Sequence, residues 1–159
     1  MFERMLVEID GSEPSDEALT AAIGVAKLFG SEVELVHVQG HKLTWAADLD
    51  LETHEEAFAL VNVALHELQA GGVEARGEVV YAEIDQTPRE IVGVAEDTDA
   101  SLVVMGTRGF GDAKALVLNS VAHAVLHRAP CPVLLTPQGN VRDGENLATP
   151  DLIELRNGL

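Results

Sequence analysis

The chain has 159 residues, of which 47% are apolar, enough to build one domain around a buried core. Its formal net charge is −17, and so acidic a surface argues against binding to nucleic acid or to an anionic membrane through a general electrostatic field. The apolar runs are also much shorter than the roughly 20 residues that a membrane-spanning helix needs. We therefore expect neither a nucleic-acid partner nor a membrane partner.

The first residues lead directly into strand-like sequence and lack the basic and apolar regions of a secretory signal. A single cysteine, Cys131, cannot form an internal disulfide, which agrees with a reducing compartment. We therefore expect a cytoplasmic protein. The excess of acidic residues has two explanations that composition leaves open: adaptation to a salt-rich cytoplasm, where ions screen self-repulsion, or solubility alone.

The N-terminal part of the chain reads as a strand, a helix and a second strand. Residues 5–9 are mostly apolar and predict the first strand, and Asp10 begins a turn. A helix is expected over residues 14–29, because apolar residues recur there at helical spacing and Gly30 suits the left-handed position after a helix end. Residues 32–38 alternate as a second strand.

The middle of the chain begins with a segment, residues 39–50, that we expect to be irregular. It contains Trp45, which we expect to anchor a loop, or to cover a ligand or a partner surface. A longer helix is predicted over residues 51–70, where apolar residues again mark one face, and residues 73–81 read as the third strand.

The next helix is expected to begin at Thr87, where a threonine cap, a first-turn proline and Glu90 form the pattern of a capping box. The fully apolar residues 102–105 predict a fourth strand. A helix over residues 120–127 and a last strand over residues 133–136 complete the pattern.

Strands and helices that alternate in this way predict parallel strands joined by helical crossovers. The expected fold class is α/β, a single domain with an open parallel five-stranded sheet and helices on both faces. We place this domain at residues 1–136 and expect a polar C-terminal tail at 137–159. Ligands of such sheets bind beyond the carboxyl ends of the strands, where the crossover direction reverses.

The junction after the fourth strand is the strongest candidate for a binding site. Gly106 and Gly109 allow the backbone to turn sharply and to bring its N–H groups close to an anion. Asn119 and Ser120 lie where the next helix should begin, and the free N–H groups of a first helical turn favour a phosphate. Arg108 is the best cationic phosphate ligand nearby, although it reads almost equally well as a solvated loop residue.

Several motifs, in the expected order, resemble the universal stress protein family. They are LVEIDGSE (6–13), LVHV (35–38), LVVMGTRG (102–109), NSV (119–121) and APCPVLL (129–135). The resemblance covers roughly residues 2–136 and implies a Rossmann-like domain of the adenine nucleotide α-hydrolase-like type.

In family members that bind ATP, the resemblance places Asp10 by the ribose, Val38 by the adenine, and the glycine loop with Ser120 around the phosphates. The residues that it implies for binding a nucleotide are Ile9, Asp10, Val38, Met105, Gly106, Arg108, Gly109, Asn119, Ser120 and Val121. The implied cofactors are ATP or AMP, with Mg²⁺ bound alongside the nucleotide.

Two positions depart from the family pattern. Asn119 stands where the family has glycine, although asparagine tolerates left-handed backbone angles and is a strong N-cap. Glu8 lies on the same side of its strand as Asp10, where a second carboxylate would repel phosphate or help to hold Mg²⁺. We expect instead that Glu8 faces solvent at an exposed edge, or pairs with Arg4 or Lys27.

The sequence does not predict dedicated catalysis. No nucleophile elbow and no Cys–His pair occurs, so Asp10 would support at most slow ATP hydrolysis. His123 and His127 have a spacing that suits one metal, but no third ligand is evident and we expect no metal site. An ATP-using ligase or hydrolase would need a further substrate site and catalytic group.

The expected function is that of an adenine nucleotide sensor that acts in stress responses through protein contacts, with a protein partner that the sequence does not identify. The alternative is a nucleotide-free dimeric adaptor or chaperone-like module with a degenerate phosphate loop. The resemblance also implies a homodimer that forms through the last strand, Val133 to Thr136, which would otherwise leave an unpaired edge.

Overall fold

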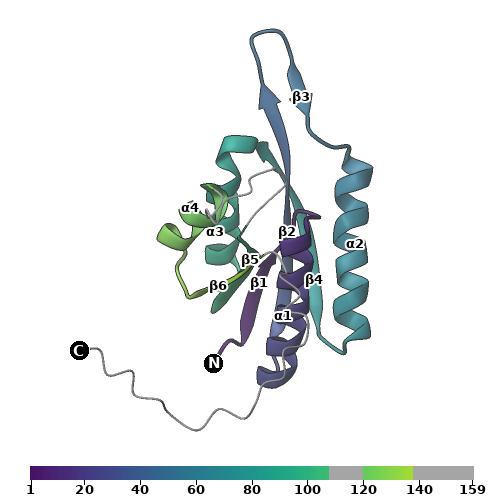
Figure 1. Ribbon diagram of the computed structural model, residues 1–159, viewed down its shortest axis with the longest axis vertical. Helices are drawn as coiled ribbons and strands as arrows, with labels where there is room; N and C mark the ends of the chain where they lie inside the picture. Colours follow the sequence, from purple (N-terminus) through teal and green to yellow (C-terminus); the bar gives the residue numbers. More distant parts are fainter. Residues whose placement is uncertain (108–119, 138–159) are drawn as a thin grey trace, which may run out of the picture.

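The computed structural model describes residues 1–107 and 120–137, and within these ranges the chain forms one six-stranded sheet covered by helices on both faces (Figure 1). The strands are β1 (Arg4–Glu8), β2 (Glu32–Leu43), β3 (Asp48–Asp50), β4 (Ala75–Glu83), β5 (Leu102–Gly106) and β6 (Val133–Thr136). The helices are α1 (Glu13–Phe29), α2 (His54–Ala70), α3 (Thr87–Asp97) and α4 (Ser120–Arg128), with a short 3₁₀ turn η1 (Ile84–Gln86) before α3.

Five of the strands are parallel and lie in the order β4-β2-β1-β5-β6, which confirms the predicted α/β fold. The chain moves outward from β1 through β2 to β4, and then crosses back to β5 and β6 on the other side of β1. The strand order therefore reverses between β1 and β5, where sheets of this kind bind their ligands.

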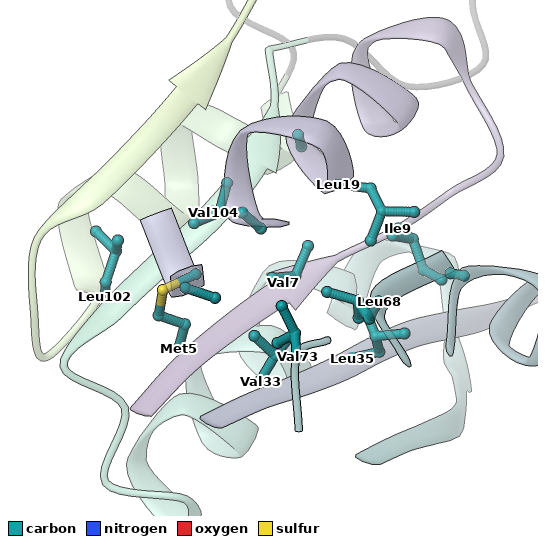
Figure 2. Close-up of a cluster of buried hydrophobic side chains, with 14 of the residues drawn as sticks. Met5, Val7, Ile9, Leu19, Val33, Leu35, Leu68, Val73, Leu102 and Val104 are labelled. Atoms are coloured by element: carbon teal, nitrogen blue, oxygen red, sulfur yellow. The ribbon is translucent and has the colours of Figure 1, made fainter. Parts of the chain in front are cut away.

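Two apolar cores lie on opposite faces of the sheet. One core contains Val7 and Leu35 under α1 and α2, and Figure 2 shows these side chains with Leu19, Leu68 and Val104. The other contains Leu6, Val36 and Val103 under α3 and α4. The central strands β1 and β5 contribute to both cores, and for this reason they read as nearly continuous apolar runs.

The helix ends follow local sequence signals, though not always the predicted ones. Gly30 ends α1 with a left-handed φ of 67°, as expected. The capping box belongs to α2, where the Thr53 hydroxyl accepts from the backbone of Glu56 and the Glu56 carboxylate accepts from the backbone of Thr53. Helix α3 begins at Thr87 as predicted, but the expected capping box was wrong, because Thr87 is the first helical residue and its hydroxyl donates to the Ile84 carbonyl of η1.

The expectation that residues 39–50 are irregular was also wrong. Strand β2 continues to Leu43, turns, and returns as the antiparallel strand β3, with Leu43 opposite Asp48 and His41 opposite Asp50. Strand β1 ends opposite Val36, so this hairpin extends beyond the carboxyl edge of the sheet (Figure 1). The segment has polar residues on both faces, which weakens the alternation that marks a strand in a sequence.

Candidate nucleotide site at the carboxyl edge

Asp10 begins the turn that joins the central strand β1 to α1, next to the reversal in strand order. Its Oδ1 accepts from the Ser12 backbone N–H at 2.9 Å and from the Ser12 hydroxyl at 2.5 Å. The Asp10 backbone N–H donates to the Ser15 hydroxyl at 3.0 Å. These bonds fix the carboxylate in place while the side chain stays partly exposed, so a ligand at this edge can reach it.

Gly106 ends β5 beside the same turn, and its lack of a side chain has a packing reason. A Cβ at this position would lie 2.8 Å from the Cβ of Pro14 and 2.9 Å from its carbonyl carbon, which is closer than real Cβ atoms approach. The Thr136 hydroxyl also donates to the Pro14 carbonyl, at 2.8 Å. The first turn of α1 is thus held directly against β5 and β6, whether or not a phosphate binds nearby.

The sheet separates the predicted apolar contacts of the nucleotide. Val38 and Met105 are both buried in the core under α3 and α4. Ile9 is buried in the other core, under α1 and α2, so its side chain does not share a face with Val38. Val38 and Met105 can therefore line one side of a ligand, whereas Ile9 can contribute only backbone atoms there; its N–H already donates to the Val36 carbonyl at 3.0 Å.

The phosphate side of the predicted site is described only in part. Ser120 is the first residue of α4 and is exposed, and Val121 is partly buried against the core under α3 and α4. Arg108, Gly109 and Asn119 lie outside the described residues. The prediction that these three hold the phosphates therefore stays a prediction.

The expectation that Glu8 faces solvent was wrong. Its side chain is only 7% exposed, because β1 is a central strand rather than an edge strand. The expected ion pair with Arg4 is also absent from the described residues, where Arg4 pairs with Asp99 at 3.2 Å. Burial, together with the nearby Asp10 carboxylate, raises the pKa of Glu8 to about 8. Glu8 is therefore mostly uncharged at neutral pH and adds little negative charge to the edge.

A network of polar side chains, not predicted from the sequence, joins the base of the hairpin to the end of β1. His37 Nδ1 lies 2.8 Å from the Ile9 carbonyl, and its Nε2 lies 2.5 Å from the Glu52 carboxylate. The Gln39 amide nitrogen donates to the Glu52 carbonyl at 3.0 Å, and its oxygen lies 2.5 Å from His54 Nδ1. The sequence does contain a signal of this network, because His37 and Gln39 are polar residues at alternate positions of an otherwise apolar strand.

Because a carbonyl can only accept, His37 carries a proton on Nδ1. The contact between Nε2 and Glu52 then needs one more proton, either on the ring or on the carboxyl group. This pairing satisfies the buried His37 ring, and it links Glu52, in the segment after β3, to Ile9, the residue that precedes Asp10. The carboxyl edge is thus bounded on one side by the hairpin base.

A metal centre finds no support in the described residues. His123 and His127 are exposed on α4, with ring centroids 4.5 Å apart and an edge-to-face arrangement. Within residues 1–107 and 120–137, no three His, Cys, Asp or Glu side chains are grouped so that they could hold a metal ion. In the same part of the chain, no helix has the length and apolar character needed to cross a membrane.

Comparison with known proteins tests the predicted resemblance directly. The sequence model of the universal stress protein family matches residues 1–137. The chain belongs to this family. A relative, the universal stress protein YxiE of Bacillus subtilis, is 32% identical over 149 residues, which cover 85% of this chain and 99% of the relative.

Solved structures of universal stress proteins show the same fold. One from Archaeoglobus fulgidus aligns with a TM-score of 0.70 and 25% identity, covering 86% of this chain and 99% of that one. Another structure from A. fulgidus, of the protein in complex with dAMP, aligns with a TM-score of 0.65 and 27% identity over 86% of this chain and 99% of that one. The universal stress protein fold thus extends over the sheet and the helices that position Asp10, Val38 and Gly106.

Proposed function

We propose that this universal stress protein binds an adenine nucleotide, such as ATP or AMP, at the carboxyl edge formed by β1, β2 and β5. The bound nucleotide reports the state of the cell, and the protein passes on that state through contacts with other proteins. In this proposal Asp10 accepts hydrogen bonds from the ribose, and Val38 and Met105 lie against the base. The loop after Gly106 and the start of α4 at Ser120 hold the phosphates.

The observation that carries the proposal is the position of Asp10. Its Oδ1 is occupied by Ser12, and the other carboxylate oxygen has no hydrogen bond to any residue in the described part of the chain. A fixed carboxylate with a free oxygen, at the reversal of strand order, suits the hydroxyl groups of a ribose. The A. fulgidus relative in complex with dAMP supports an adenine nucleotide as the ligand.

The charges at the edge agree with an anionic ligand near neutral pH. Glu8 is mostly uncharged there, because burial raises its pKa to about 8, and one oxygen of the Asp10 carboxylate already accepts two hydrogen bonds from Ser12. The chain as a whole carries a net charge of −17, which opposes a polyphosphate. We therefore include Mg²⁺, which would enter with ATP and offset phosphate charge.

A nucleotide-free adaptor is the second candidate, and Asn119 is the observation that favours it. The residue replaces a glycine of the family pattern in the segment where backbone N–H groups would meet a phosphate. In this alternative the edge around Asp10 is a structural turn, and the contacts with other proteins alone constitute the function.

The two candidates can be separated by titration calorimetry with AMP and with ATP plus Mg²⁺, at 0.1 M and 2 M KCl. We expect saturable binding to the wild type and at least a tenfold loss of affinity in Asp10→Ala. The matched control, Asp16→Ala, removes an exposed carboxylate from α1 and should leave affinity unchanged. Absence of binding by folded wild type at millimolar nucleotide, with binding restored by Asn119→Gly, would support the adaptor.

We also propose that the protein forms a homodimer through β6. This strand lies at an edge of the sheet, and in the described residues its only strand partner is β5. Its apolar residues Val133, Leu134 and Leu135 remain partly exposed. Pairing with a second copy would cover these side chains and the free backbone groups of the strand.

A further inference from the structure

The tip of the β2–β3 hairpin exposes large apolar side chains that the fold does not use. We define the hairpin tip as Leu43, Trp45 and Leu49, whose exposed fractions are 64%, 101% and 51%. Single exposed apolar residues are common on protein surfaces, but a group of three on one projecting segment is not. Figure 1 shows this hairpin extending away from the helices and from the rest of the sheet.

Polar contacts, rather than these apolar side chains, hold the hairpin in shape. The Thr44 hydroxyl donates to the Ala47 carbonyl at 2.7 Å and accepts from the Ala47 N–H at 3.0 Å, which closes the turn. Tyr81 stacks on His41 with ring centroids 4.5 Å apart, and its hydroxyl donates to Asp50 at 2.7 Å. The network around His37 and Gln39 fixes the base. The hairpin tip is therefore ordered and presented before any partner binds.

The charges around the hairpin tip indicate what kind of partner fits. Asp48 and Asp50 lie on β3 itself, Glu83 is paired in register with His41, and Asp85 follows directly in η1. Lys42 is the one Lys or Arg among residues 41–51. The apolar tip thus has an acidic rim, and it would be complemented by an apolar pocket with a basic rim.

We propose that the hairpin tip is a docking surface for another protein, whose apolar pocket is surrounded by Lys and Arg side chains and receives Trp45 as an anchor. Tryptophan is enriched among the residues that dominate binding energies at protein interfaces. A second copy of this chain docked tip to tip fits less well, because it would place the acidic rims of two hairpins, each with Asp48 and Asp50, against each other. The proposal does not depend on nucleotide binding, since no residue of the tip belongs to the predicted nucleotide site.

Trp45 is the single tryptophan of the chain, so its fluorescence reports directly on the hairpin tip. The probe is a labelled amphipathic helical peptide of Leu and Lys, compared with a peptide of equal charge made of Ser and Lys. Both are titrated without nucleotide in 0.5 M KCl, where screening acts beyond about 4 Å and charge alone binds weakly. We expect the Leu/Lys peptide to bind with a blue shift of the Trp45 emission, and the Ser/Lys peptide to bind at least tenfold more weakly.

The variants Trp45→Ser and Leu49→Ser should each weaken binding of the Leu/Lys peptide at least fivefold, as measured by anisotropy of the label. The control, Leu28→Ser, removes a leucine that is even more exposed than Leu49 from the far end of α1, and it should have no effect. The proposal is overturned if the peptide does not bind, or if it binds the hairpin variants as well as the wild type. It is also overturned if the emission shifts with protein concentration alone, which would identify a second copy as the occupant.

Discussion

The buried carboxyl of Glu8 should make the stability of the protein depend on pH. Burial beside Asp10 raises the pKa of Glu8 from 4.5 to about 8 in the folded chain, so the folded state holds this proton more tightly than the unfolded state. The Glu8 contribution to the free energy of unfolding therefore falls as pH rises from about 4.5 to about 8, and is constant above that.

Glu8→Gln removes this contribution. The free energy of unfolding of the variant, relative to that of the wild type, should rise by on the order of a few kcal/mol when the pH is raised from 5 to 8.5. Urea denaturation at each pH measures this difference. Glu17→Gln, an exposed carboxylate on α1, serves as the control and should show no such gain. Equal pH profiles for Glu8→Gln and the wild type would show that Glu8 ionises normally in the folded protein.

Gly106 offers a second test at the scale of single residues. In Gly106→Ala the new methyl group would meet Pro14 at 2.8 Å, so β5 and the first turn of α1 must separate. We expect a loss of about 1–3 kcal/mol in the free energy of unfolding. Gly93→Ala is the matched control, since a Cβ there meets nothing within 4 Å inside α3, and this change should stabilise the protein by up to about 1 kcal/mol. Similar effects at both positions would contradict the close approach.

Single residues also show what the sequence can and cannot predict about the site. Asp10 and Gly106 were expected at the carboxyl edge because both follow apolar strands, and the structure places them there. The burial of Glu8 was not predictable from its local sequence, because an acidic residue at a strand end looks the same on an edge strand as on a central one. Only the pairing of β1 with both β2 and β5 decides the difference.

At the scale of elements, the prediction worked where the hydrophobic period was strong. The strands β1, β5 and β6 and the helices α1 and α4 lie within about two residues of their expected bounds. The hairpin was missed because its stability comes from side-chain contacts, such as Tyr81 with His41 and Asp50, between segments far apart in the sequence. Such contacts leave no periodic signal.

The proposed dimer through the edge strand β6 can be tested by a charge placed on that strand. Sedimentation velocity should give the mass of two chains for the wild type, and of one chain for Leu134→Lys, because a charge on the paired edge opposes association. Leu28→Lys adds the same charge to an exposed site on α1 and should remain dimeric. A wild type that is monomeric at micromolar concentration would show that there is no such dimer. A Leu134→Lys variant that stays dimeric would place the interface elsewhere.

At the scale of the whole molecule, the alternation of strands and helices was enough to predict a parallel α/β sheet. It was not enough to predict the strand order, because alternation is compatible with several orders. The reversal between β1 and β5 follows from pairing between strands that are far apart in the sequence. The same pairing places the turn at Asp10 and the end of β5 at Gly106 on one edge of the sheet. The resemblance to universal stress proteins, which the family match over residues 1–137 confirms, implied no strand order, but it did imply that Asp10 and the glycine loop serve one ligand.

The hydrogen bond from Thr136 to Pro14 joins residues 122 positions apart. On the ribosome, therefore, the first turn of α1 is made early but receives this contact only after β6 has been synthesised and has emerged from the exit tunnel. The backbone bond from Thr107 to Thr136 depends on the same late strand. A nascent chain that has already folded β1, α1 and β2 must hold Asp10 near its final position without that support, and the carboxyl edge is completed last.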